Sequence, residues 1–171
     1  MSDDGTITPT LFVGTLSIDG TLMHCPAWDL PDIGELWLGP AVRGEDRVIA
    51  GRTGVLAYPR RGTVTTRSLR MIVSGVVDRN GDPWSDLGDI TDECQRHQIG
   101  LQRNIAYLRA NVTDPTNVGD GTRTAVLTLP DPAEDPVTAP VHVLGMTPGA
   151  KLGPVQRFTL ELSFPLGALV P

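Results

Sequence analysis

Three histidines and two cysteines are the side chains of this sequence best suited to catalysis or metal binding. His24, His97 and His142 lie far apart, and no pair shows the spacing of metal ligands. His24 adjoins Cys25, but neighbouring residues of a strand point to opposite faces, which argues against a catalytic dyad. Cys25 and Cys94 are too few for a C-x-x-C metal site. They either form a disulfide or, as we favour, remain two buried free thiols.

The acidic and glycine-rich stretches of the sequence do not predict a metal-binding or phosphate-binding site either. The run Asp78-Arg79-Asn80-Gly81-Asp82 is superficially like part of a calcium loop, but it lacks the alternating acids and the distal glutamate. We expect a turn there, followed by the acidic start of a helix. Gly51-x-x-Gly54 and Gly119-x-Gly121 do not precede a helix with a lysine, so a phosphate-binding loop is unsupported. The sequence therefore predicts no catalytic residue, no metal and no cofactor, and hence no enzyme.

The remaining distinctive side chains suit contacts between proteins. Trp28 and Trp37 are expected to be core or interface anchors. Segment 42–62 is rich in arginine, whose planar fork binds carboxylates in a bidentate manner. Its arginines are Arg43, Arg47, Arg52, Arg60 and Arg61. The segment is either a solvated loop or an arm that reaches another subunit, and we treat these arginines and both tryptophans as candidate inter-subunit contacts.

Composition limits the class of protein. The chain has 171 residues, with 20 acidic and 14 basic side chains and a net charge of −6. A protein that reads nucleic acid normally carries a basic stripe, and none is present. The acidic start, residues 1–5, is unlike a secretory signal, and the apolar runs are too short for a membrane span. We expect one soluble domain over residues 1–171.

The elements that must position these residues are mostly strands. The 19 glycines and 15 prolines favour many short strands over a helical bundle. Asp19-Gly20 between two apolar runs is a strong hairpin signal. We expect strands at 10–18, 21–25, 35–38, 48–50, 55–58, 63–79, 123–129, 141–145 and 155–164, with 130–140 an exposed loop. The last strand alternates Phe158, Leu160, Leu162 and Phe164 with polar residues, as a half-buried antiparallel strand does.

Residues 89–111 form the clear helix. Apolar residues recur there with a period of 3.6, and Asp89 can cap the first turn. Gly100 is unfavourable inside a helix, which indicates close packing against a strand. Strands before and after one helix predict a mainly β fold: a rolled antiparallel β-sandwich or barrel with one α-helix packed on it.

Two stretches of sequence resemble siphophage tail proteins. They are Val48-Ile49-Ala50-Gly51-Arg52-Thr53-Gly54-Val55-Leu56, followed by Arg60-Arg61-Gly62, and Arg67 to Gly75. In that family a glycine-arginine-x-glycine turn precedes a strand, and a long strand ends in valine-x-glycine. The family includes the tail tube (major tail) protein and the distal tail (hub) protein, which share a rolled β-sandwich with one helix. The opening Leu16-Ser17-Ile18-Asp19-Gly20 also resembles the start of distal tail proteins.

The resemblance implies a virion protein assembled in the host cytoplasm. Subunits of the family join sheet edges into hexameric rings, which stack with other tail proteins around the tape measure and let genome DNA pass. An acidic lumen suits a DNA conduit, and Asp78 and Glu161 are our candidate lumen acids. Distal tail proteins often carry a second, carbohydrate-binding-like domain, for which 171 residues leave no room, so we expect the tube subunit. The alternatives are the distal tail protein and, more remotely, a small β-sandwich ligand-binding module that uses Trp28, Trp37 and Trp84.

Overall fold

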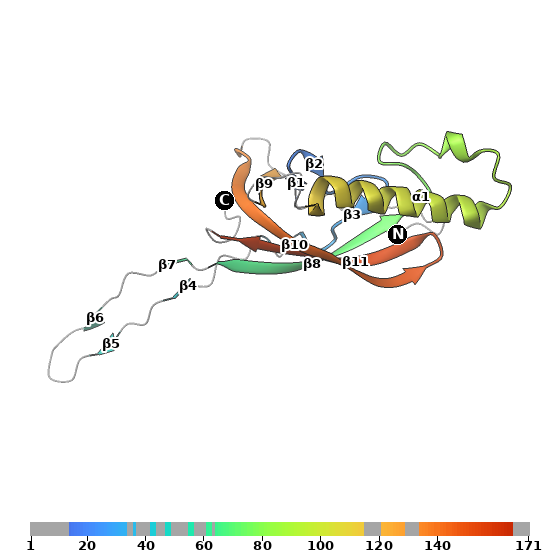
Figure 1. Ribbon diagram of the computed structural model, residues 1–171. Helices are drawn as coiled ribbons and strands as arrows, with labels where there is room; N and C mark the ends of the chain where they lie inside the picture. Colours follow the sequence, from blue (N-terminus) through green and yellow to red (C-terminus); the bar gives the residue numbers. More distant parts are fainter. Residues whose placement is uncertain are drawn as a thin grey trace.

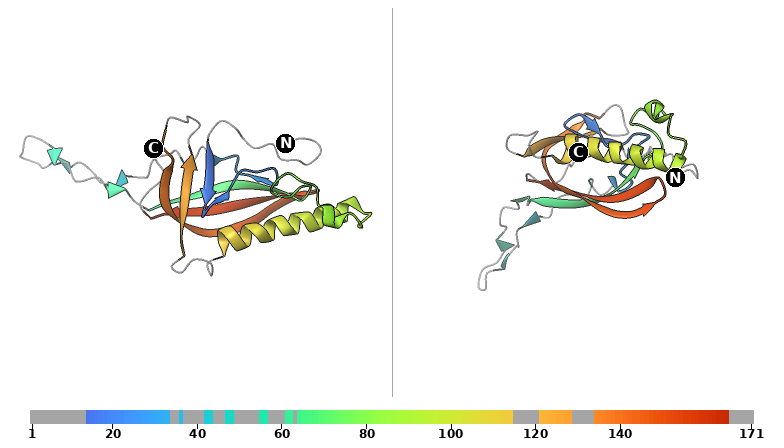
Figure 2. Two further views of the ribbon diagram at one scale, coloured as in Figure 1. Left: turned by 90° about the horizontal axis from the view of Figure 1, so that it is seen from above. Right: turned by 45° about the vertical axis from the view of Figure 1, so that its right-hand side comes forward.

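The computed structural model describes residues 14–33, 36, 64–114, 121–128 and 134–165, together with the backbone of four two-residue strands between 42 and 62. Over these residues the chain is mainly β with one α-helix, as predicted. Figure 1 shows the helix lying along one face of a twisted sheet, and Figure 2 shows the same arrangement from two further directions. The expected strands at 10–13, most of 35–38, and Trp37 fall outside the described residues.

Seven strands form the main antiparallel sheet, in the spatial order β2-β1-β9-β10-β11-β8-β3. The two outermost strands belong to one short stretch of chain, because β2 and β3 are close together in sequence. The Trp28 indole Nε1 donates to the carbonyl of Leu22 at 3.0 Å, which ties these outer strands together. The sheet is therefore rolled, as expected. The strands are β1 (Thr15–Ile18), β2 (Thr21–Leu22), β3 (Trp28–Asp29), β8 (Thr65–Ser74), β9 (Thr122–Thr128), β10 (Val137–Leu152) and β11 (Val155–Phe164).

Strand β10 produces much of the roll. Its first part, Val137–His142, pairs with β9, whereas the part from His142 to Leu152 pairs with β11. The register shifts between Val143 and Gly145 and again between Pro148 and Lys151. Such bulges bend a strand and increase its twist. The expected loop at 130–140 and short strand at 141–145 were wrong for residues 137–152, because this strand accommodates prolines that usually interrupt a sheet.

Alternation in the sequence sets the core. On β11 the four residues Phe158, Leu160, Leu162 and Phe164 are all buried, and β11 has the predicted bounds. Strand β8 contributes Met71 and Leu69, which lie opposite Phe158 and Leu160, and also Val73. The helix covers this surface with Leu101 and Leu108. Burial of these apolar side chains is the main favourable free-energy term of the fold.

Helix α1 spans Glu93–Leu108 and continues as one π-helical turn, Arg109–Thr113. Its N-cap is Asp92, whose carboxylate accepts from the Cys94 amide at 2.9 Å. The expected cap at Asp89 was wrong, because Asp89 lies in a turn that follows the short 3-10 helix η2 (Ser85–Leu87), before the first residue of α1. Helix α1 packs closely on the end of β8 at Gly100, where an added Cβ would meet the carbonyl oxygen of Gly75 at 2.2 Å. This contact confirms the predicted close packing.

Four short strands lie in sequence between β3 and β8. Strand β4 (Val42–Arg43) pairs with β7 (Arg61–Gly62), and β5 (Arg47–Val48) pairs with β6 (Val55–Leu56), all antiparallel. In sequence, the β5–β6 pair lies inside the β4–β7 pair, which is the order of strand pairs in a single long hairpin. Figure 1 places both pairs beyond the end of β8, away from the seven-stranded sheet. We call residues 42–62 the arm.

Both cysteines are free thiols. Cys94 is exposed on the first turn of α1, so the expectation that both are buried was wrong for this residue. Cys25 is partly buried beside β3, and removal of the thiol from water raises its pKa.

Candidate interaction surfaces

Besides the outer edges of the short end strands β2 and β3, two longer stretches of strand edge in the main sheet have no neighbouring strand among the described residues. Strand β8 pairs with β11 over its full length on one side. On the other side β3 pairs with Ile72 and Val73, and the amides of Ser74 and Arg70 donate to the Ala27 carbonyl at 2.8 Å and to Asp32 Oδ2 at 3.2 Å, so only the part before Arg70 has no such partner strand or acceptor beside it in the described residues. The part of β10 from Val143 to Leu152 pairs with β11 on one side only. An open edge presents unpaired N–H and C=O groups and can pair with another chain. These two edges are the most direct candidates for contacts between subunits.

Exposed apolar side chains accompany these edges. Leu144 and Leu152 on β10 are each 57% exposed, and Val64, immediately before β8, is 61% exposed. Apolar residues of this size are normally tolerated singly on a surface. Their position beside open backbone groups adds apolar area to any strand that pairs there.

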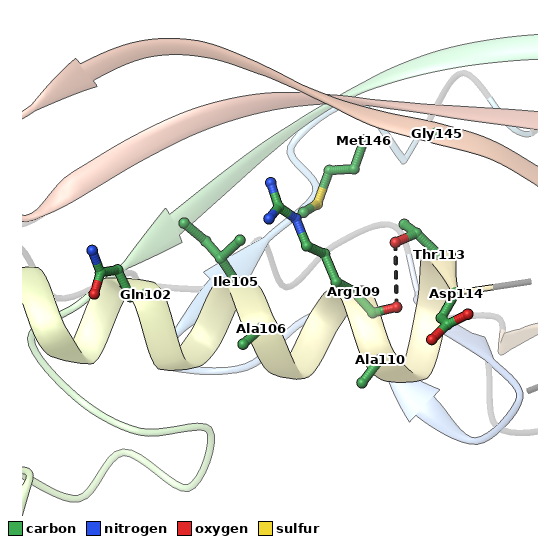
Figure 3. Close-up of a pocket in the computed structure, with 9 residues that line it drawn as sticks. All are labelled: Gln102, Ile105, Ala106, Arg109, Ala110, Thr113, Asp114, Gly145 and Met146. Carbon is green, nitrogen blue, oxygen red and sulfur yellow. Dashed lines mark hydrogen bonds between the residues drawn. The ribbon is translucent and has the colours of Figure 1, made fainter. Parts of the chain in front are cut away.

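A groove runs between the end of α1 and the first bulge of β10. It encloses about 810 Å³, and Figure 3 shows that its wall on the helix side continues into the π-helical turn. The lining residues are Gln102, Ile105, Ala106, Arg109, Ala110, Thr113, Asp114, Gly145 and Met146. The Thr113 hydroxyl donates to the Arg109 carbonyl at 3.3 Å, which occupies that hydroxyl within the helix. The groove mixes apolar and charged groups, as surfaces that contact proteins do.

The predicted contact residues are distributed unequally. Arg43, Arg47 and Arg61 lie in β4, β5 and β7 of the arm, whereas Arg52, Arg60 and Trp37 lie outside the described residues. Trp28 matches the core alternative of the sequence prediction, and an inter-subunit contact for it stays a prediction. Its side chain is 2% exposed and belongs to the core, because β3 faces the interior on both of its residues.

The two candidate lumen acids occupy different settings. Asp78 lies in the turn after β8, where its Oδ1 accepts from the amides of Asn80 and Asp82 at 2.8 and 2.9 Å. These hydrogen bonds confirm the predicted turn. Glu161 lies in the middle of β11, between buried neighbours and therefore on the opposite face of the sheet from the core. Whether either carboxylate faces a lumen stays a prediction.

Sequence reasoning missed two buried polar groups. His24 Nδ1 lies 2.6 Å from Asp29 Oδ1, and both side chains are about 5% exposed or less. Arg123 on β9 is buried as well, with three hydrogen-bond acceptors described below. Since Arg123 shares a strand face with Ala125 and Leu127, the alternation of β9 carried a signal that this arginine points inward.

No helix in the described part of the chain is long and apolar enough to cross a membrane. Within the same residues, no group of three or more potential metal ligands comes together.

The rolled sheet with one helix defines the class of fold. No protein-family profile matches the chain, and neither does any curated protein. Among solved structures, the chain is similar to the SPP1 Dit (gp 19.1) protein, described as a paradigm of the hub adsorption apparatus in phages that infect Gram-positive bacteria. The identity is 18% and the TM-score 0.45, over 91% of this chain and 51% of that one. The chain thus spans about half the length of that structure.

Proposed function

We propose that this chain is a structural subunit of a siphophage tail, and that copies of it join into a ring. The observation that carries the proposal is the combination of an arm outside the main sheet with two open sheet edges. Each edge offers backbone groups to a neighbour, and a closed ring is one way to pair every such edge. The resemblance of segments 48–62 and 67–75 to siphophage tail proteins supplies the biological setting.

The arm register supports a role in assembly. Arg43 and Arg61 are direct partners across the β4–β7 pair. Like charges at facing positions destabilise an isolated strand pair. Carboxylates from a neighbouring subunit would relieve this repulsion, and the chain carries a surplus of them, with 20 acids against 14 bases. The arginines of the arm are therefore proposed to pair with acids across a subunit contact.

Two positions in the tail are candidates. A tail tube subunit would stack into long tubes, whereas a distal tail (hub) subunit would stop at a closed ring. The hub is favoured by residues 16–20, which resemble the start of distal tail proteins and form the β1–β2 turn of this structure. Negative-stain electron microscopy of the purified protein at high concentration distinguishes tubes from separate rings.

The decisive variant is Arg43→Glu combined with Arg61→Glu. We expect it to abolish rings and tubes while the circular dichroism spectrum stays that of the parent. Arg157→Glu, a charge reversal at an exposed position of β11 outside the arm, the groove and both open edges, is the matched control and should assemble normally. A parent protein that remains monomeric at every concentration in light scattering would contradict the proposal. Normal assembly of the double variant would show that the arm arginines are not needed for assembly.

A further inference from the structure

A small pocket beside α1 gathers aromatic and cationic side chains that are distant in sequence. Arg79 comes from the turn after β8, Trp84 precedes η2, and Arg103 and Tyr107 lie on α1. The pocket encloses about 250 Å³ and is completed by Trp28, Asp78 and Asn104. Such convergence of aromatic and charged groups in a concave site is typical of a recognition site.

The aromatic rings of this pocket contact one another and the two guanidinium groups. Tyr107 stacks on Trp28 with 5.7 Å between ring centroids, and the Arg79 guanidinium carbon lies 4.9 Å from the Tyr107 centroid. Arg103 lies over the Trp84 ring at 5.3 Å. The rings therefore hold the two guanidinium groups in place through cation–π contacts.

The two guanidinium groups differ in their pairing. Arg103 Nη1 donates to Asp86 Oδ2 at 2.6 Å. Arg79 Nη1 donates to the Tyr107 hydroxyl at 2.8 Å, and Arg79 makes no ion pair within the described part of the chain. Asp78, which also lines the pocket, uses its oxygens inside its own turn. Since a guanidinium has five N–H donors, Arg79 has donors left for an anion.

We propose that this pocket binds the carboxylate of an acidic side chain on a protein partner. A guanidinium matches a carboxylate in bidentate geometry. The volume is smaller than the ~300–1,000 Å³ of ordinary small-molecule sites, and it suits one side chain. The nearby Asp78 carboxylate disfavours a dianion such as phosphate. The inference does not rest on the proposed tail function, because it follows from Arg79 and its surroundings alone.

The test is a titration followed by nuclear magnetic resonance of the arginine Nε–H and tryptophan indole N–H signals. The probe is Gly-Glu-Gly with both ends blocked, and Gly-Gln-Gly is its neutral counterpart. We expect saturable shifts of the Arg79 and Trp84 signals with the glutamate peptide and none with the glutamine peptide. Arg79→Gln should weaken binding at least about tenfold, since truncation of one member of a charged pair is costly. Arg109→Gln should leave the affinity unchanged.

Titrations with glucuronate and with inorganic phosphate show which kind of anion the pocket prefers. Tighter binding of glucuronate than of the glutamate peptide would overturn the assignment to a protein side chain. Tighter binding of inorganic phosphate would overturn the assignment to a carboxylate. Absence of any saturable shift would overturn the site itself. Because the Arg79 side chain is exposed, its replacement leaves the core intact. The peptide titration measures binding to one chain, so its outcome does not depend on whether the protein forms rings.

Discussion

Arg123 is buried in β9 and joins three separate segments. Its Nη1 donates to Asp19 Oδ2 at 2.9 Å and to the Asn111 carbonyl at 2.8 Å, and its Nη2 donates to the Asp114 carbonyl at 2.5 Å. The guanidinium thus satisfies carbonyls at the end of the π-helical turn, which a helix terminus leaves without partners. Asp19 in turn sits in the β1–β2 hairpin with a φ of 48°.

We predict that Arg123→Met lowers the free energy of unfolding by about 3 kcal/mol, because buried carbonyls lose charge-assisted hydrogen bonds. Urea denaturation followed by circular dichroism measures the change. Arg109→Met, the same substitution at an exposed position, is the control and should change the value by less than about 0.5 kcal/mol. Equal stability of the two variants would show that the Arg123 hydrogen bonds contribute nothing measurable.

Asp32 and Arg70 form a bidentate pair on the surface of β8. Arg70 Nε and Nη2 donate to Asp32 Oδ2 and Oδ1, each at 2.6 Å. Hydrogen bonds from Arg70 hold the pKa of Asp32 below its ordinary value of 3.8. A lowered pKa in the folded state means that the pair stabilises the protein above the unfolded pKa, and that this stability is lost as the pH falls through the folded pKa.

We therefore predict that Arg70→Gln raises the pKa of Asp32 towards 3.8. Carbon-13 resonance of the Asp32 carboxyl group, recorded against pH, reports the value directly. Since Arg70 is largely exposed, the stability lost above that pH is about 1 kcal/mol or less. An unchanged Asp32 titration in the variant would mean that solvent screens the pair completely. Arg109→Gln serves as the control.

At the scale of elements, the crossing of α1 over the end of β8 depends on two glycines. An added Cβ at Gly100 would lie 2.2 Å from the Gly75 carbonyl oxygen and 2.3 Å from Trp84 Nε1. An added Cβ at Gly75 would lie 2.0 Å from the His97 carbonyl oxygen. Two backbones therefore meet where neither side has room for a methyl group.

We predict that Gly100→Ala destabilises the fold by about 3 kcal/mol or more, because the backbone must separate. Helix propensity alone gives the opposite sign, since alanine is favoured over glycine by about 1 kcal/mol inside a helix. Thermal unfolding of Gly100→Ala against Gly145→Ala decides the matter, because a Cβ at Gly145 would meet nothing within 4 Å. A stabilised Gly100→Ala would show that propensity outweighs packing here.

Local pattern predicted some elements well and others poorly. Strand β11 was predicted with its bounds, because strict alternation of large apolar and polar residues is typical of a half-buried strand. Strand β10 was not, since Pro140 and Pro148 read as interruptions although both pair in the sheet. The pocket that joins Trp84 with Tyr107 depends on how α1 packs, which no local pattern reports. Within the arm, the two short strands predicted at 48–50 and 55–58 correspond to β5 and β6, whereas β4 and β7 were not predicted.

At the scale of the whole molecule, the charge of the chain bears on DNA. A protein with a net charge of −6 and no basic stripe should not hold a polyanion. We predict negligible binding of duplex DNA by the assembled protein at physiological salt, measured by fluorescence anisotropy of a labelled duplex. Tight binding with a steep salt dependence would contradict passage of DNA and favour a role in holding it. Lysozyme, a basic protein, provides a positive control for the assay.

The ladder between β8 and β11 has a mechanical consequence. Ten residues of each strand pair in unbroken register, from Thr65 opposite Phe164 to Ser74 opposite Val155. The arm is attached directly before β8, so a pull on the arm along the strand axis loads all ten pairs in shear at once. Strand pairs whose hydrogen bonds are all loaded at the same time resist far more force than pairs whose hydrogen bonds break one after another. A tension applied to the arm would therefore be transmitted to the body of the molecule before the sheet gives way.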